Sequence, residues 1–173
     1  MNIVNSALGH YEVLGQAAEA EVVIGHSFGT ATSEGSVNAA ITRLILENSS
    51  NRPIIVDRML VDPLGLGEEE LALVVDGPIS NTVGQGVGTW GVLEAVQSYM
   101  REREMQAALM IAHASHIGRV VMQAEKLGIR SITLPGMPTH FDKDSDQLFT
   151  RHPALWVPRE VLGSFVLRTQ DKL

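Results

Sequence analysis

The segment at residues 112–119 reads Ala-His-Ala-Ser-His-Ile-Gly-Arg and combines two imidazoles, a hydroxyl and a guanidinium. His116 or His113 could carry a proton, because the ordinary pKa of imidazole, about 6.5, lies close to neutrality. Arg119 follows His116 by one helical turn, and its N–H donors could hold a carboxylate or a phosphate. We expect Arg119 to be exposed, so that Arg119→Ala would weaken ligand binding and leave stability nearly unchanged.

The spacing of these two histidines would suit a metal only if both lay on one helix. His113 is expected to end a strand, and the sequence places no Asp or Glu beside His113 or His116. We therefore expect no metal site here.

An earlier polar turn, Gly25-His26-Ser27-Phe28-Gly29, has the spacing of the G-x-S-x-G nucleophile elbow of α/β-hydrolases. A serine hydrolase with Ser27 as nucleophile is therefore one hypothesis. The polar stretch after Gly29, where the elbow requires a helix, favours another interpretation. In it, Gly25, His26, Ser27 and Gly29 form a loop whose backbone N–H groups bind an anion. Asp57 ends the next expected strand, where Rossmann-like proteins place the acid that binds ribose.

A third polar turn, Ser80-Asn81-Thr82, follows another apolar run and is itself followed by Gly84, Gly86 and Gly88. Ser80 or Thr82 could cap the next helix. The glycines leave the backbone open to close approach, as an anion-binding turn requires. We expect Ser80, Asn81 and Thr82 to hydrogen-bond the ligand.

Short apolar runs that predict buried strands alternate with segments of helical periodicity. The expected strands are residues 21–25, 53–57, 71–75, 107–112 and 129–134. The expected helices are residues 2–18, 34–47 with Ser33 as cap, 90–103, 115–127 closed by Gly128, and 158–167, the last either wholly helical or a helix followed by a strand. This alternation favours a three-layer α/β/α fold with a mainly parallel sheet of about five strands, Rossmann-like in the broad sense. The length of 173 residues suits one domain spanning 1–173.

Charge and composition exclude several classes of function. The net charge of −7 and the absence of any Lys/Arg block argue against a nucleic-acid partner. The chain has no cysteine, which excludes disulfides, thiolate zinc sites and a Cys nucleophile. No apolar run approaches the roughly 18 residues of a membrane span, and the amino terminus does not read as a signal peptide. We expect a soluble, cytoplasmic protein, and the sequence leaves a homo-oligomer open.

Taken together, these motifs resemble the YdcF/SanA/ElyC-like bacterial family. The resemblance rests on the strand ending at Gly25, the Ser80-Asn81-Thr82 turn, the His116-Ile117-Gly118-Arg119 segment before an apolar helix, and Arg159-Glu160-Val161-Leu162-Gly163. It covers about residues 20–165, with the motifs in the family's order. The chain departs from the family at Gly84-Gln85, where Glu-Asn is usual. The resemblance implies an α/β fold with its site at these turns, and no defined reaction.

These observations predict a chain that binds a small anionic or nucleotide-like metabolite at the carboxyl edge of the sheet. The cofactor is unknown, and a nucleotide or an S-adenosylmethionine-like ligand would fit this interpretation. Two alternatives stay open: the serine hydrolase that uses Ser27, and a non-catalytic metabolite-binding or assembly protein. If a reaction occurs, His116 or His113 is expected to carry the proton.

Overall fold

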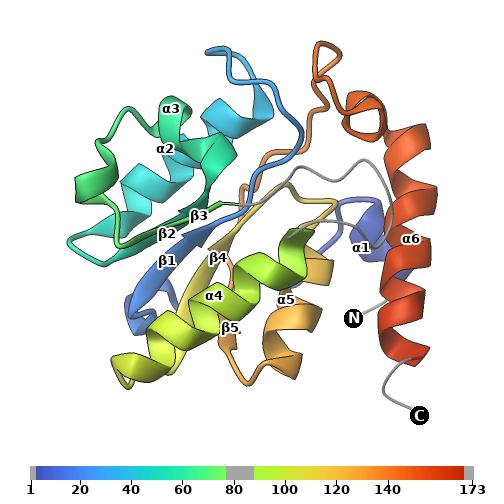
Figure 1. The fold of residues 1–173 in the computed structure, drawn as a ribbon. Coiled ribbons are helices and arrows are strands. Elements are labelled where there is room, and N and C mark those ends of the chain that lie inside the picture. Colours follow the sequence, from blue (N-terminus) through green and yellow to red (C-terminus); the bar gives the residue numbers. More distant parts are fainter. Residues whose placement is uncertain (1–2, 77–87, 170–173) are drawn as a thin grey trace.

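The computed structural model describes residues 3–76 and 88–169, and these form a parallel sheet covered by helices (Figure 1). Within this part of the chain the sheet has five strands in the order β3-β2-β1-β4-β5. The strands are β1 (Val22–Gly25), β2 (Ile54–Asp57), β3 (Leu73–Val75), β4 (Ala107–Ile111) and β5 (Arg130–Ile132). All four pairings between neighbours are parallel. The Rossmann-like α/β fold expected from the sequence is confirmed.

The two central strands are buried along their whole length, which explains why their sequences are continuous apolar runs. Every residue of β1 and of β4 is buried, and Val23 pairs with Leu109 across the two strands. A parallel strand covered on both faces needs no alternation of apolar and polar side chains.

Helices cover both faces of the sheet. They are α1 (Ile3–Ala7), α2 (Val37–Ser49), α3 (Val61–Leu64), α4 (Gly88–Glu102), α5 (Ile117–Lys126) and α6 (Pro153–Thr169). Short 3-10 turns occupy Ala17–Glu19, Arg58–Leu60, Glu68–Glu70 and Leu148–Arg151. In Figure 1, α2 and α3 lie on one side of the sheet and α4 and α5 on the other, while α6 stands beside α1. Among the described residues, no helix is long and apolar enough to cross a membrane.

The expected bounds of three helices are wrong, two of them for a local reason. The opening helix ends at Ala7, because Gly9 and Gly15 adopt positive φ values of 89° and 66° that interrupt a helix. Helix α2 begins at Val37, and its cap is Ser36, whose Oγ accepts from the N–H of Ala39 at 3.2 Å. Helix α6 already begins at Pro153 and is helical to Thr169, so the alternative with a terminal strand is excluded.

The strand order places a topological switch point between β1 and β4. Connections from β1 run to β2 and β3, whereas the connection after β4 runs the other way to β5. The loops that follow β1 and β4 therefore diverge to opposite faces of the sheet, which is where α/β proteins bind ligands. The N–H of His26, just after β1, donates to the carbonyl of Ile111 at the end of β4 at 2.9 Å, so the two loops start side by side.

Candidate functional site

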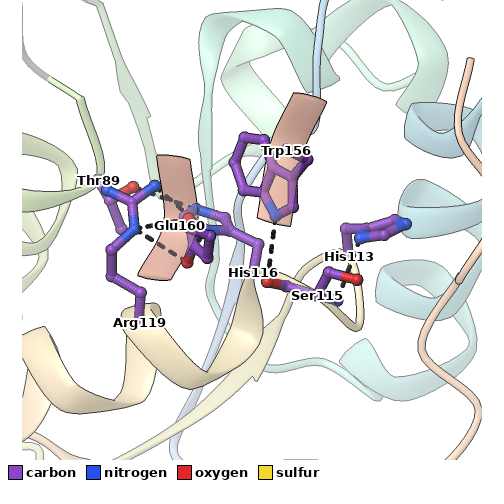
Figure 2. Close-up of polar contacts among 7 residues, drawn as sticks. All are labelled: Thr89, His113, Ser115, His116, Arg119, Trp156 and Glu160. Atoms are coloured by element: carbon purple, nitrogen blue, oxygen red, sulfur yellow. Dashed lines mark hydrogen bonds and ion pairs between the residues drawn. The ribbon is translucent and has the colours of Figure 1, made fainter. Parts of the chain in front are cut away.

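A cluster of polar side chains lies at the start of α5, directly after β4 (Figure 2). His116 contributes its ring, with Nδ1 3.2 Å from Glu160 Oε1 and Nε2 3.1 Å from Thr89 Oγ1. Arg119 donates from Nε to both carboxylate oxygens of Glu160 at 3.0 Å. We name these four residues, Thr89, His116, Arg119 and Glu160, the His116 cluster. It joins the amino ends of α4 and α5 to the middle of α6.

The proton on the neutral His116 ring can sit on either nitrogen, and the contacts of the ring bear on which one it occupies. A carboxylate oxygen only accepts hydrogen bonds, so a proton on Nδ1 satisfies the contact with Glu160. The lone pair of Nε2 then accepts the hydroxyl proton of Thr89. Nδ1 also lies 3.3 Å from Nη2 of Arg119, which is a donor, so Glu160 and Arg119 make opposite demands on this nitrogen. The tautomer with its proton on Nδ1 is the one that leaves Nε2 able to take a proton. Burial and the nearby Arg119 lower the pKa of His116 below its usual value, so the ring is neutral near neutral pH.

Glu160 is ionised although it is buried. Burial by itself would raise its pKa, but Arg119 and His116 lower it, and the net pKa lies below the ordinary value for a glutamate. Only 4% of the Glu160 side chain and 21% of the Arg119 side chain are exposed. The sequence places no acid beside His116, but the fold does, and the expectation that Arg119 is an exposed arginine is wrong. The acid comes from α6, 44 residues further along the chain.

A second guanidinium gives this region a net positive charge. Arg159 lies half-buried on α6, 4.9 Å from the centre of the Phe149 ring. Burial and the charge of Arg119 lower its pKa, which indicates that the two guanidinium groups repel each other. The charged groups that act on His116 are Arg119, Glu160 and Arg159, so two cations face one carboxylate. Residues 77–87, which precede α4, contain no charged side chain.

His26 directly follows β1, beside this cluster, and has an unsatisfied ring nitrogen. Its residue surface is 2% exposed, and Nε2 has no hydrogen-bond partner within the described residues. Burial, His116 and Arg119 together lower its pKa to about 3. A buried polar atom without a partner is costly unless a ligand or water completes it. His26 therefore has one ring nitrogen without a partner, buried next to the switch point.

His113 has both ring nitrogens engaged by the backbone. Nδ1 accepts from the N–H of Ser115 at 3.1 Å, and Nε2 donates to the carbonyl of His140 at 3.0 Å. The ring stacks on Phe28 with 3.9 Å between centroids, and burial lowers its pKa to about 4. Of the two histidines expected to carry a proton, His116 is therefore the better placed.

The loop after β1 directs its backbone donors into the protein. The N–H of Ser27 donates to Asp57 Oδ2 at 2.7 Å, and the N–H of Phe28 donates to Asn38 Oδ1 at 2.8 Å. Asp57 Oδ1 also accepts from the N–H of Met59 at 3.2 Å. Burial raises the pKa of Asp57, against these hydrogen bonds. The backbone N–H of Ser27, expected to bind an anion, is thus hydrogen-bonded to Asp57, the acid expected to bind ribose.

The amino end of α2, the usual phosphate position of a Rossmann-like fold, holds a carboxylate of this chain. Both oxygens of Asp142 accept from the N–H of Val37, at 3.1 and 3.0 Å. Asp142 is 9% exposed. A ligand phosphate at this helix end would have to displace a buried carboxylate, so the α2 end is a poor phosphate site.

Ser27 lacks the partners of an elbow nucleophile. The hydrogen bonds of the described histidine rings join His113 and His152 to the backbone, and His116 to Thr89, Glu160 and Arg119. The carboxyl group near Ser27 is Asp57, which accepts its backbone N–H. Among the described residues, the carboxylate–imidazole–hydroxyl order that hydrolases use is present at Glu160, His116 and Thr89 instead.

The remaining predictions add no residue to the candidate site. Ser80, Asn81 and Thr82 lie outside the described residues. No group of His, Asp and Glu within residues 3–76 and 88–169 is arranged to hold a metal ion. One cavity of about 150 Å³ borders Ile117 and Gly118, next to the cluster in sequence, and another of about 330 Å³ lies between α2 and residues 136–140. Neither is lined by a member of the His116 cluster.

Sequence reasoning assigned no role to Thr89, Arg159 or Glu160. The available signal was the Arg159-Glu160 pair, because two adjacent charges in an otherwise apolar helical stretch indicate a partner for at least one of them. Thr89 gave no signal of its own.

Comparisons of this chain with protein families, with curated proteins and with solved structures found no match.

Proposed function

We propose that this chain binds a small anionic metabolite, phosphate-bearing or nucleotide-like, at the carboxyl edge of the sheet beside the His116 cluster. We also propose that it belongs to the YdcF/SanA/ElyC-like family. The motifs at His116–Arg119 and Arg159–Gly163, which carry that resemblance, meet in one cluster through the Arg119–Glu160 ion pair.

The observation that carries the proposal is the charge balance at the switch point. Two guanidinium groups face one carboxylate there, although the chain as a whole has a net charge of −7. Partly buried cations without matching anions attract a negatively charged ligand more strongly than exposed cations do. The unsatisfied Nε2 of His26 supports the same location.

The occupied positions narrow the binding mode. Asp142 already holds the N–H of Val37, and Asp57 already holds the N–H of Ser27. A ligand bound in the usual dinucleotide manner would compete with both carboxylates. The anionic part is therefore expected on the α4, α5 and α6 side, near Arg159 and Thr89.

Isothermal titration with AMP, inorganic pyrophosphate and S-adenosylmethionine tests this proposal. AMP or pyrophosphate should bind, because each carries phosphate, and S-adenosylmethionine tests the nucleoside part without phosphate. Arg159→Gln should weaken binding by roughly 10- to 150-fold, the worth of a hydrogen bond to a charged group. Its melting temperature should stay close to that of the parent, since a half-exposed arginine contributes little to stability.

Arg101→Gln, at an exposed position near the end of α4, is the matched control and should leave affinity unchanged. Heats of binding that are absent for all three compounds would refute the proposal. Unchanged affinity in Arg159→Gln would show that the site lies elsewhere.

A further inference from the structure

We propose that Thr89 is a nucleophile, activated by His116 and oriented through Glu160, and that the chain hydrolyses phosphomonoesters bound at this site. The proposal rests on the proposed function, because the anionic ligand supplies the phosphoryl group. It rests on the geometry of the cluster, which puts a hydroxyl, an imidazole and a carboxylate in sequence (Figure 2).

The three groups are ordered from the interior outward. Glu160 and His116 are 3% and 4% exposed, whereas Thr89 is only half-buried. The carboxylate contacts the imidazole at Nδ1, so Nε2 points toward Thr89. Thr89 is the least buried of the three residues, and its Oγ1 lies 3.1 Å from Nε2, the nitrogen that would take its proton.

The neighbouring charges fit a phosphoryl group. Phosphoryl transfer is catalysed mainly by positioning and by stabilising the equatorial oxygens. Arg159 and Arg119 supply positive charge beside Glu160, and the neutral His116 can act as a base near neutral pH. A neutral acyl substrate carries no negative charge, so the excess positive charge of Arg159 beside the Arg119–Glu160 pair would have no partner.

The step balances within the protein and substrate. Thr89 Oγ1 attacks phosphorus, its proton moves to His116 Nε2, and an Oγ1–P bond forms while the ester P–O bond breaks. The proton on Nε2 then passes to the departing alkoxide. In the second half, water attacks the phosphothreonine and gives a proton to Nε2. That proton returns to Oγ1 as inorganic phosphate leaves.

The test uses p-nitrophenyl phosphate and the full chain. The parent protein should release p-nitrophenol, and acid-quenched protein should carry phosphate on Thr89 when its peptides are analysed by mass spectrometry. Thr89→Val should lower turnover at least about 100-fold, as loss of an activated nucleophile requires. Thr89→Ser should retain turnover and phosphorylation at position 89, while Thr32→Val, at an exposed threonine, should leave turnover unchanged.

Glu160 is a positioning residue, so its effect should appear in the pH profile. Turnover of the parent should rise with pH as the His116 ring loses its proton. Glu160→Gln should lower kcat and shift the pH at which turnover rises, with KM changing less.

Binding of inorganic phosphate, followed by calorimetry in the same variants, separates the two proposals. If phosphate binds but the parent shows no turnover, or if turnover survives Thr89→Val, the nucleophile is refuted and the binding site stands. If neither phosphate nor AMP binds, the site itself is refuted.

Discussion

At the scale of single residues, Arg119 is a candidate for ligand binding that also forms a structural ion pair with Glu160. Its Nε donates to both oxygens of Glu160, a carboxylate that has almost no contact with solvent. Removing one partner of a buried pair leaves the other charge unpaired, which costs far more than removing an exposed arginine. The expectation that Arg119→Ala would leave stability unchanged is reversed by this geometry.

Arg119→Ala should lower the free energy of unfolding by roughly 2–4 kcal/mol, toward the low end of buried pairs because Arg119 keeps some exposure. Urea denaturation followed by circular dichroism measures the effect. Adding Glu160→Gln to this variant should recover part of the loss, since the unpaired charge is then removed. A single variant as stable as the parent would show that the pair contributes nothing.

At the scale of elements, Gly25 at the end of β1 and Gly29 in the loop after it serve packing. A Cβ on Gly25 would lie 2.4 Å from Ile45 Cδ1 of α2, and a Cβ on Gly29 would lie 2.5 Å from both Ser145 Oγ and Thr150 Oγ1. Gly29 also has a φ of 80°. The loop can therefore pass under α2 and against residues 145–150 only because these positions lack a side chain.

Gly29→Ala should destabilise the protein by about 2–5 kcal/mol, the sum of a left-handed backbone and an overpacked contact. Gly136→Ala separates the two causes, because Gly136 has a φ of 82° but open space around its Cβ. That control should cost only about 1–2 kcal/mol. Thermal or urea unfolding of both variants checks the difference, and equal losses would refute the packing role of Gly29.

At the scale of the whole molecule, three buried imidazoles make stability depend on pH. His26, His113 and His116 are at most 4% exposed, and their pKa values are all lowered, to about 3 for His26 and about 4 for His113. The native protein keeps them neutral, whereas the unfolded chain protonates them below about pH 6.5. The unfolded state then binds more protons, so stability falls as pH decreases through this range.

His26 and His113 should each contribute a slope of about 1.4 kcal/mol per pH unit below about pH 6.5, and His116 should add to it in the same direction. Urea denaturation at several values from about pH 7 to about pH 5 measures the total slope, to which the raised pKa of buried Asp57 makes a contribution of opposite sign. His26→Phe should remove the contribution of His26 to this slope, whatever the variant does to the free energy of unfolding at a single pH. A slope that His26→Phe leaves unchanged would mean that His26 is protonated in the native protein.

Much of the fold could be predicted from the sequence, because it depends on local patterns. The apolar runs around Val23, Ile55 and Leu109 have the length and composition of buried parallel strands, and they are strands. Gly128 was expected to close the helix after residue 115, and it follows α5 with a φ of 74°. The polar turn at residues 112–116 does connect a strand to a helix.

The partners of the site residues were decided only by the tertiary structure. His116 contacts Thr89 and Glu160, which lie 27 residues before it and 44 residues after it. No periodicity relates such positions, because the contact depends on where α4 and α6 pack around α5. The N–H groups after β1 are likewise hydrogen-bonded to Asp57 and Asn38, whose side chains reach them only in the folded chain.

The sequence alone determined which elements form and which turns carry chemically active groups. Long-range packing determined which of those groups face one another, because side-chain contacts between distant segments exist only once the sheet and its helices are assembled.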